Sequence, residues 1–167
     1  MQAERTLLPL SDPRVASAIQ LVWHEASLLD EKRYEDWERL WAPDGLYVIP
    51  IDPDAEDFAS VLNMVYDDAR MRRMRVERLV SGYSISVTAA ARTVRTVSRF
   101  TAAEGPDGAV ELRSAQVLVG HKRDVTFVVG ADLTHWIRVE DGIPRLARKV
   151  VRLVDSEAAV DALGFLL

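Results

Sequence analysis

The sequence contains no cysteine among its 167 residues, and this absence removes several kinds of chemistry at once. Without a thiol, the chain can form no disulfide, no thiolate nucleophile and no thiolate metal site. It also lacks any apolar run near the roughly 20 residues that a membrane-spanning helix needs. Residues 1–10 lack the basic start and the long apolar stretch of a signal peptide. We therefore expect a soluble protein with a cytoplasmic location.

The sequence also has fewer basic than acidic residues. The chain has 21 basic and 26 acidic residues, a formal net charge of −5, whereas nucleic-acid-binding domains are usually basic. Gly/Ser linkers, internal repeats and low-complexity tracts are missing as well. At roughly 100–200 residues per domain, the length predicts a single domain over residues 1–167. We expect an N-terminal arm over residues 1–11 and a C-terminal tail over residues 156–167.

The first third of the sequence has helical patterning. Asp12 can cap a helix whose first position is Pro13. Apolar residues then recur at helical spacing on one face: Val15, Ile19, Val22, Ala26 and Leu29. A second, short helix is predicted from Tyr34 to about Trp41, ended by a turn at residues 43–45.

After residue 45, the sequence first shows short strand and helix signals and then long segments with strand patterning. Residues 46–51 read as a strand, residues 61–66 as strand or helix, and Asp67 or Asp68 can cap a helix that reaches Gly82. Four long segments rich in β-branched residues follow: residues 93–104, 109–121, 125–139 and 145–154. Strands of such length predict a strongly curved, mainly antiparallel sheet around the N-terminal helices. The predicted fold class is therefore α+β, a cone-shaped roll.

One carboxyl group is a candidate catalytic base. Asp30 lies at the edge of the first helix's apolar stripe, one turn before Tyr34. In a closed cavity, burial could raise the pKa of such a carboxyl and make it a general base. The simpler interpretation is a boundary residue that caps the second helix or pairs with an arginine. Both interpretations stay open at this point.

The histidines do not predict a metal site. A mononuclear iron centre typically uses two histidines and a carboxylate on one face. The chain has only His24, opposite the core stripe of its helix, and His121 and His135, 14 residues apart. We expect solvent-facing or structural imidazoles, with no metal and no cofactor bound by this chain.

Other residues are candidates for subunit contacts. An arginine run at residues 70–78 is interleaved with acids and is either a solvated helix face or an interface. The apolar end, which includes Phe165 and Leu167, should dock against its own sheet or a neighbour. Trp136 could line a contact surface, whereas Trp23, Trp37 and Trp41 are expected near the core. The possible interface set is Arg70, Arg72, Arg75, Arg78, Trp136, Phe165 and Leu167.

Five segments, read in order, resemble one family. Residues 25–37 (EASLLDEKRYEDW) are similar to the opening helix pair of the β subunits of aromatic-ring-hydroxylating dioxygenases. Residues 44–50 (DGLYVIP) resemble the first strand of that family, and residues 66–79 resemble its "YDD…R…RV…L" segment. Residues 148–153 (RKVVRL) and 163–167 (LGFLL) resemble its last strand and tail. The order and spacing of the segments make the resemblance fairly specific and extend it over nearly the whole chain.

The resemblance implies a fold shared with nuclear transport factor 2 and a non-catalytic role in the catabolism of aromatic compounds. By resemblance, three β chains form a trimer within an α3β3 hetero-oligomer. The α subunit would carry a Rieske [2Fe-2S] cluster and mononuclear Fe(II), and would receive electrons through a ferredoxin and a reductase. Departures at residues 88–95, Arg99 and 132–136 leave the aromatic substrate open. Alternatives are a stand-alone dehydratase or isomerase using Asp30 and Tyr34, and a small-ligand-binding homo-oligomer.

Overall fold

The computed structural model describes residues 4–81, 91–156 and 166–167. Helix α1 (Pro13–Asp30) begins at the predicted cap, where Asp12 Oδ1 accepts a hydrogen bond from the backbone N–H of Arg14 at 2.8 Å. Proline at the first helical position forfeits no hydrogen bond, because that N–H has no partner within a helix. The buried face of α1 is apolar except for Glu25.

Helix α2 is shorter than predicted, and the strand after it starts earlier. Helix α2 spans only Tyr34–Glu38, and strand β2 (Trp41–Pro50) already begins at Trp41. The predicted helix end at Trp41 and the predicted turn at residues 43–45 are therefore wrong. The reason is tertiary: β2 pairs with the last strand, and a register shift between Trp41 and Leu46 accommodates the proline and glycine between them.

The ambiguous stretch near residue 61 resolves into two elements. A 3₁₀ turn, η1 (Phe58–Ser60), precedes strand β3 (Asn63–Asp67), so the strand interpretation is the correct one. Helix α3 (Ala69–Val80) follows, and Asp68 caps it by accepting a hydrogen bond from the N–H of Met71 at 2.9 Å. The predicted end at Gly82 falls outside the described residues.

The second half forms the predicted long strands within two residues at each end. They are β4 (Arg92–Glu104), β5 (Val110–Lys122), β6 (Val125–Glu140) and β7 (Ile143–Leu153). A 3₁₀ turn, η2 (Pro106–Gly108), joins β4 to β5, and a two-residue strand, β1 (Leu7–Leu8), lies in the predicted N-terminal arm. The sheet order is β1-β4-β5-β6-β7-β2-β3, and every pair is antiparallel except β2–β7.

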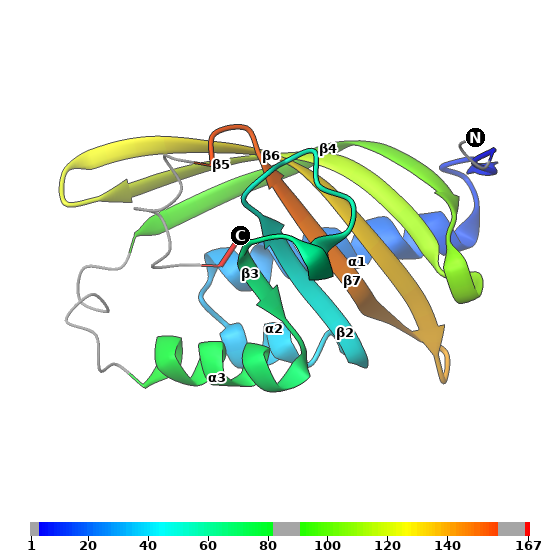
Figure 1. Cartoon of the computed structure of the whole chain (residues 1–167), viewed down its shortest axis with the longest axis horizontal. Coiled ribbons are helices and arrows are strands. Elements are labelled where there is room, and N and C mark those ends of the chain that lie inside the picture. Colours follow the sequence, from blue (N-terminus) through cyan, green and yellow to red (C-terminus); the bar gives the residue numbers. More distant parts are fainter. Residues whose placement is uncertain (1–3, 82–90, 157–165) are drawn as a thin grey trace.

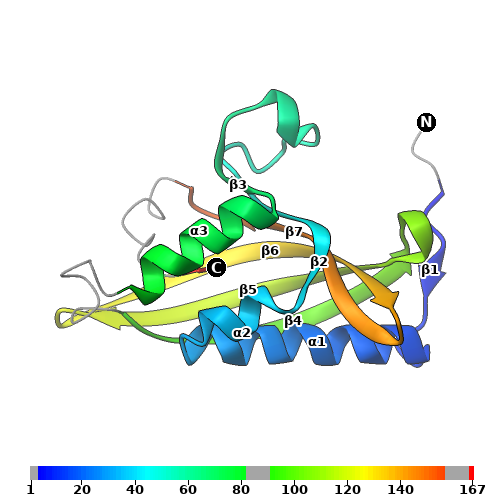
Figure 2. The same cartoon turned by 90° about the horizontal axis from the view of Figure 1, so that it is seen from below.

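The sheet is strongly curved and separates two unequal layers (Figures 1 and 2). Helix α1 packs across one face, against β4, β5 and β7, and the main core lies between them. On the other face, the 51–62 loop folds back over β2 and β7, where Phe58 and Ala55 pack on Val48 and Val150. The predicted α+β class, with N-terminal helices over a curved and mainly antiparallel sheet, is confirmed.

One core prediction is wrong. Trp37 and Trp41 are buried as expected, but the side chain of Trp23 is about half exposed. Its indole N–H donates to the carbonyl oxygen of Val97 at 2.9 Å, and its ring meets Phe100 edge to face. An indole can cover a sheet edge with its apolar face while its N–H bonds a backbone carbonyl, and helical spacing cannot distinguish that role from burial.

Candidate functional site: a buried ion-pair cluster and an arginine-lined pocket

The predicted candidate base, Asp30, is held by three hydrogen bonds. Its Oδ1 accepts from the hydroxyl of Thr93 at 2.9 Å and from Nε of Arg95 at 2.8 Å, and its Oδ2 accepts from the backbone N–H of Arg95 at 2.9 Å. Tyr34 is buried nearby, and burial raises the pKa of its phenol, an effect opposed by Arg95 and reinforced by Asp30. This geometry ties the end of α1 to β4.

A second charged cluster lies inside the main core, between α1 and the sheet. Glu25, His135 and Lys149 are each at most 2% exposed. Lys149 Nζ donates to Glu25 Oε1 at 2.7 Å, and His135 Nε2 lies 2.9 Å from Glu25 Oε2. The indole of Trp37 also donates to Oε1, at 3.0 Å. The carboxylate is therefore paired through both oxygens, as a buried charge must be.

The environment sets the protonation of this cluster. Burial alone would raise the pKa of Glu25, but the charges and hydrogen bonds of Lys149 and His135 outweigh it and hold that pKa well below its usual value. Burial lowers the pKa of His135 from 6.5, although Glu25 opposes the shift. Burial lowers the pKa of Lys149 as well, and Glu25 again opposes the shift. Because its pKa lies below 6.5, His135 holds a neutral imidazole at neutral pH.

The chain end is seated on the same cluster. Leu166 and Leu167 are almost fully buried. The carbonyl oxygen of Leu167 accepts from Lys149 Nζ at 2.8 Å and from the hydroxyl of Tyr47 at 2.9 Å, and that of Leu166 accepts from Arg95 at 3.0 Å. These contacts support docking of the tail within its own chain. Phe165, the other tail residue predicted as an interface, lies outside the described residues.

The arginine run on α3 divides into structural and exposed members. Arg72 is buried, donates to the carbonyl oxygen of Gly45 and to Glu38, and stacks over the ring of Trp41. Arg75 pairs with Asp67 through two hydrogen bonds, of 2.6 and 3.2 Å. Two further residues of the predicted interface set remain on the surface of this helix: Arg70 and Arg78.

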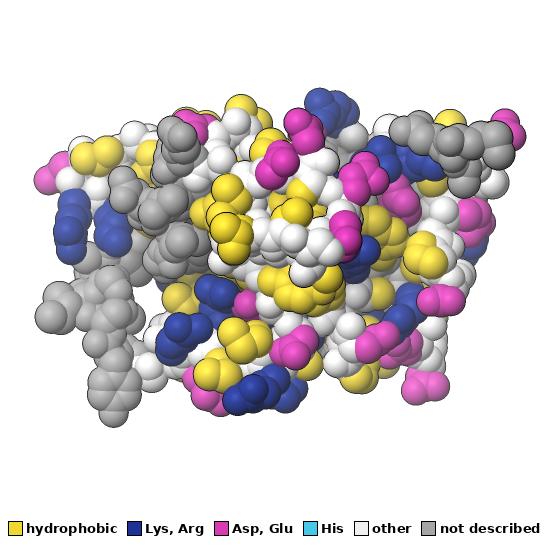
Figure 3. Space-filling view, viewed as in Figure 1, with side chains coloured by type: hydrophobic (Ala, Val, Ile, Leu, Met, Phe, Trp, Pro, Cys, Tyr) yellow, Lys and Arg dark blue, Asp and Glu magenta, His cyan; other side chains and the backbone are white. Residues whose placement is uncertain are grey.

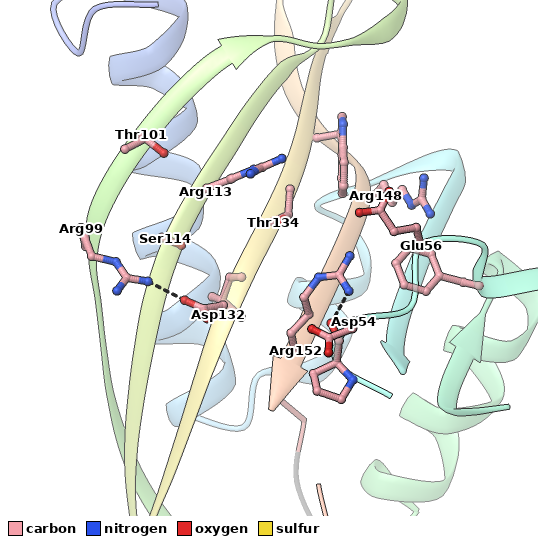
Figure 4. Close-up of a pocket in the computed structure, with 14 residues that line it drawn as sticks. Asp54, Glu56, Arg99, Thr101, Arg113, Ser114, Asp132, Thr134, Arg148 and Arg152 are labelled. Carbon is pink, nitrogen blue, oxygen red and sulfur yellow. Dashed lines mark hydrogen bonds and ion pairs between the residues drawn. The ribbon is translucent and has the colours of Figure 1, made fainter. Parts of the chain in front are cut away.

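A polar pocket of about 670 Å³ opens on the sheet face opposite α1 (Figure 4). Its floor comes from strands β4 to β7, and the 51–62 loop forms one wall. On the side of the molecule that shows this loop, basic, acidic and apolar side chains are interspersed (Figure 3). The charged lining residues are Arg99, Arg113, Arg148, Arg152, Asp54, Glu56 and Asp132.

Two arginines of β7 dominate this pocket. The guanidinium of Arg148 lies 5.0 Å from the ring centroids of both Phe58 and Trp136, and that of Arg152 lies 5.3 Å from Phe58. Arg152 also donates to the carbonyl oxygens of Pro53 and Ala55, at 2.6 and 2.7 Å. These contacts fix the loop on the sheet, and they place the predicted contact residue, Trp136, in the pocket wall.

The remaining arginines of the pocket already have carboxylate partners. Arg99 pairs with Asp132 across the pocket floor, as Figure 4 shows, and Arg113 pairs with Glu111 at 2.9 Å. Arg99 has a positive φ of 58° at the point where the β4–β5 register shifts. This irregularity places its side chain over the pocket.

The histidines stay apart from one another. His24 is exposed on α1, and His121 is exposed near the β5–β6 hairpin, where its Nδ1 lies 2.9 Å from the hydroxyl of Thr126. Across residues 4–81, 91–156 and 166–167, no three potential metal-binding side chains cluster. Within the same ranges, no helix is long and apolar enough to span a membrane.

Sequence reasoning missed Glu25, Lys149 and the Arg148–Arg152 pair. Glu25 lies three and four residues from Val22 and Leu29, on the apolar face of its helix, so the pattern contained a signal for a buried charge. Lys149 carried no comparable signal, because an apolar pair follows it and an arginine precedes it. Pairing across more than 100 residues is visible only in the folded chain.

Comparisons with known proteins identify a family to which the chain is similar. Residues 24–158 match the family model described as "Ring hydroxylating beta subunit". The chain is 26% identical to the N,N-dimethyl phenylurea N-demethylase subunit beta of Sphingobium sp. (strain YBL2), with 86% of each chain covered. It is 32% identical over 108 residues to the chlorobenzene dioxygenase subunit beta of Cupriavidus sp. (strain PS12), which covers 59% of this chain and 58% of the relative.

Solved structures agree at the level of the fold. The β subunit of benzoate 1,2-dioxygenase from Burkholderia mallei ATCC 23344 superposes with a TM-score of 0.74 at 16% identity, covering 91% of this chain and 97% of that one. A putative scytalone dehydratase from Novosphingobium aromaticivorans DSM 12444 gives 0.62 at 11% identity, covering 84% and 83%. The chain belongs to the family of β subunits of aromatic-ring-hydroxylating dioxygenases.

Proposed function

We propose that this chain is a non-catalytic assembly subunit that holds catalytic α subunits in place, in an α3β3 complex with a β trimer. Family membership already makes it a subunit of an oxidoreductase complex and implies association with an α subunit. The observation that carries the non-catalytic assignment is the engagement of the charged groups inside the roll. Both oxygens of Asp30 and both oxygens of Glu25 bind side chains or backbone of the same chain.

The donor set of this chain does not fit the metal centres of the reaction. A Rieske cluster requires two cysteines and two histidines, and the sequence has no cysteine. His135 Nε2 faces Glu25 in a fully buried site, while His24 and His121 lie on the surface. We place the Rieske cluster and the mononuclear iron in the α subunit, which would receive electrons through a ferredoxin and a reductase.

The test has two stages. The full chain, purified alone, should be colourless and iron-free, should oxidise no arene, and should have a solution mass near 56 kDa, three times 18.7 kDa. A tagged full chain, recovered from its native host, should bring down a second chain that contains iron and an iron–sulfur absorbance and that oxidises an aromatic substrate. Iron held by this chain, or arene oxidation by it alone, would refute the proposal.

A separate variant addresses the stand-alone dehydratase or isomerase with Asp30 and Tyr34. Asp30→Asn removes the carboxylate and keeps an acceptor for Thr93. In a complex that still assembles, this variant should leave arene oxidation nearly unchanged, because the role of Asp30 is to bind Arg95 and Thr93. Loss of turnover with assembly intact would instead favour a catalytic Asp30.

A further inference from the structure

In the pocket opposite α1, two guanidinium groups have no carboxylate partner within the part of the chain that the structure describes. The Arg148 guanidinium lies over the Phe58 and Trp136 rings, and among the described residues its buried Nε has no hydrogen-bond acceptor. Arg152 donates to the neutral carbonyls of Pro53 and Ala55, and its guanidinium lies 5.3 Å from the centroid of the Phe58 ring. A buried donor without an acceptor is costly, and arginine is the side chain best shaped to bind a carboxylate through two parallel hydrogen bonds.

The electrostatics of the pocket favour a single negative charge. Four arginines and three carboxylates line it, which leaves a net charge of +1. Burial lowers the pKa of Arg148; Tyr66 opposes this shift, and the nearby charge of Arg152 reinforces it. An incoming anion would offset both the cost of burying the Arg148 charge and the repulsion between Arg148 and Arg152. A net charge of +1 matches one carboxylate better than it matches a phosphate group with two negative charges.

We infer that this pocket is a docking site for an aspartate or glutamate side chain of the catalytic α subunit, with Arg148 and Arg152 as its receptors. The inference rests on the proposed function and names the contact chemistry. Strand alternation places the exposed side chains of Val117 and Val128 on the same sheet face, farther along β5 and β6. A surface in which a charged pocket continues into exposed apolar residues suits a protein partner better than a small molecule.

The test uses the full tagged chain in its native host. The variant Arg148→Gln/Arg152→Gln removes both receptor charges and keeps polar side chains. The matched control, Lys122→Gln/Arg123→Gln, removes two charges at the β5–β6 hairpin, away from the pocket. Three quantities are compared with the wild type: the amount of the iron–sulfur subunit recovered, the solution mass of the purified chain, and its melting temperature.

We expect the pocket variant to recover at least about tenfold less iron–sulfur subunit, because truncating one side of a buried charge pair weakens association strongly. Its fold and self-association should match the wild type, and the hairpin control should recover a normal amount. Equal recovery by the pocket variant and the wild type would refute the inference. Loss of self-association in the pocket variant would also refute it, by assigning the site to a second copy of this chain.

Two further outcomes are separable. If the wild type brings down no iron–sulfur subunit, the proposed assembly function fails, and the inference fails with it. If the double variant melts early, the single variant Arg152→Gln decides, since that side chain lies against loop carbonyls and not between two rings. Normal recovery by this folded single variant would count against the docking site, and reduced recovery would support it.

Discussion

At the scale of single residues, a buried charge cluster lies within the apolar core of this protein. Glu25, on α1, contacts Lys149 on β7, His135 on β6 and the Trp37 indole on α2. Buried ion pairs often contribute little net stability compared with apolar substitutes, but the loss of one partner is severe. The cluster therefore makes each member depend on the others.

Replacing Lys149 with methionine should expose this dependence. The variant leaves the buried Glu25 carboxylate without its ammonium partner, and we expect the free energy of unfolding to fall by about 3–5 kcal/mol. The double variant Glu25→Gln/Lys149→Met should recover much of that loss. Urea unfolding followed by circular dichroism measures both. Lys122→Met serves as the control and should change stability by less than about 0.5 kcal/mol, and a similar value for Lys149→Met would contradict the cluster.

The imidazole of His135 should give stability a distinct pH dependence. Burial lowers its pKa from 6.5, so below pH 6.5 the unfolded chain binds a proton that the folded chain does not. Stability rises with pH wherever the unfolded chain binds more protons, so this contribution is present above pH 6.5 and is lost as the pH falls. His135→Gln keeps a donor for Glu25 without titrating. Its melting temperature should decline less between pH 6.5 and 5.5 than that of the wild type, and parallel declines would refute a neutral His135.

At the scale of elements, two glycines of the long β5–β6 ladder have different roles. Both pair in continuous register, so neither Gly120 nor Gly130 marks a bulge. A Cβ on Gly120 would lie 2.3 Å from Cζ of Phe127, its cross-strand partner, whereas one on Gly130 would lie 3.3 Å from a methyl group of Val154. Gly120 thus provides the space that the Phe127 ring occupies against the neighbouring strand.

Gly120→Ala should therefore destabilise the chain more than Gly130→Ala does. Overpacking of this kind costs about 1–3 kcal/mol, since the ring of Phe127 must leave its position. The double variant Gly120→Ala/Phe127→Leu should cost less than the sum of the two single variants, because the smaller side chain leaves room for the new methyl group. Thermal melting of the four variants measures this. Equal effects at the two glycines would show that the ring is not held by close contact.

The strands show which parts of this structure can be predicted from the sequence. Local patterns locate the four long strands within two residues at each end, because turn residues and β-branched runs are local signals. The local pattern does not locate the start of strand β2, since Pro43 and Gly45 signal a turn while pairing with β7 determines the strand. The pocket could not be predicted at all. Its arginines are spaced four apart in sequence, but Phe58 and Trp136 reach them only through the folded loop and the neighbouring strand.

At the scale of the whole molecule, the last two residues connect elements from both halves of the chain. Carbonyl oxygens of Leu166 and Leu167 accept from Arg95 on β4, Tyr47 on β2 and Lys149 on β7. Their apolar side chains belong to the main core. If this docking holds the roll together, its loss should reduce the stability of the isolated chain and should not depend on a partner subunit.

Leu167→Ala distinguishes docking within the chain from a contact between chains. Truncating a fully buried leucine costs about 2–5 kcal/mol, so urea unfolding of the purified variant should show a loss in that range. Leu62→Ala, at a side chain that is 82% exposed, should change stability by less than about 0.5 kcal/mol. The prediction is contradicted if the isolated Leu167→Ala chain is as stable as the wild type but binds the α subunit less well. That outcome would assign Leu167 to the subunit interface, whereas the predicted loss means that the tail completes the core before assembly begins.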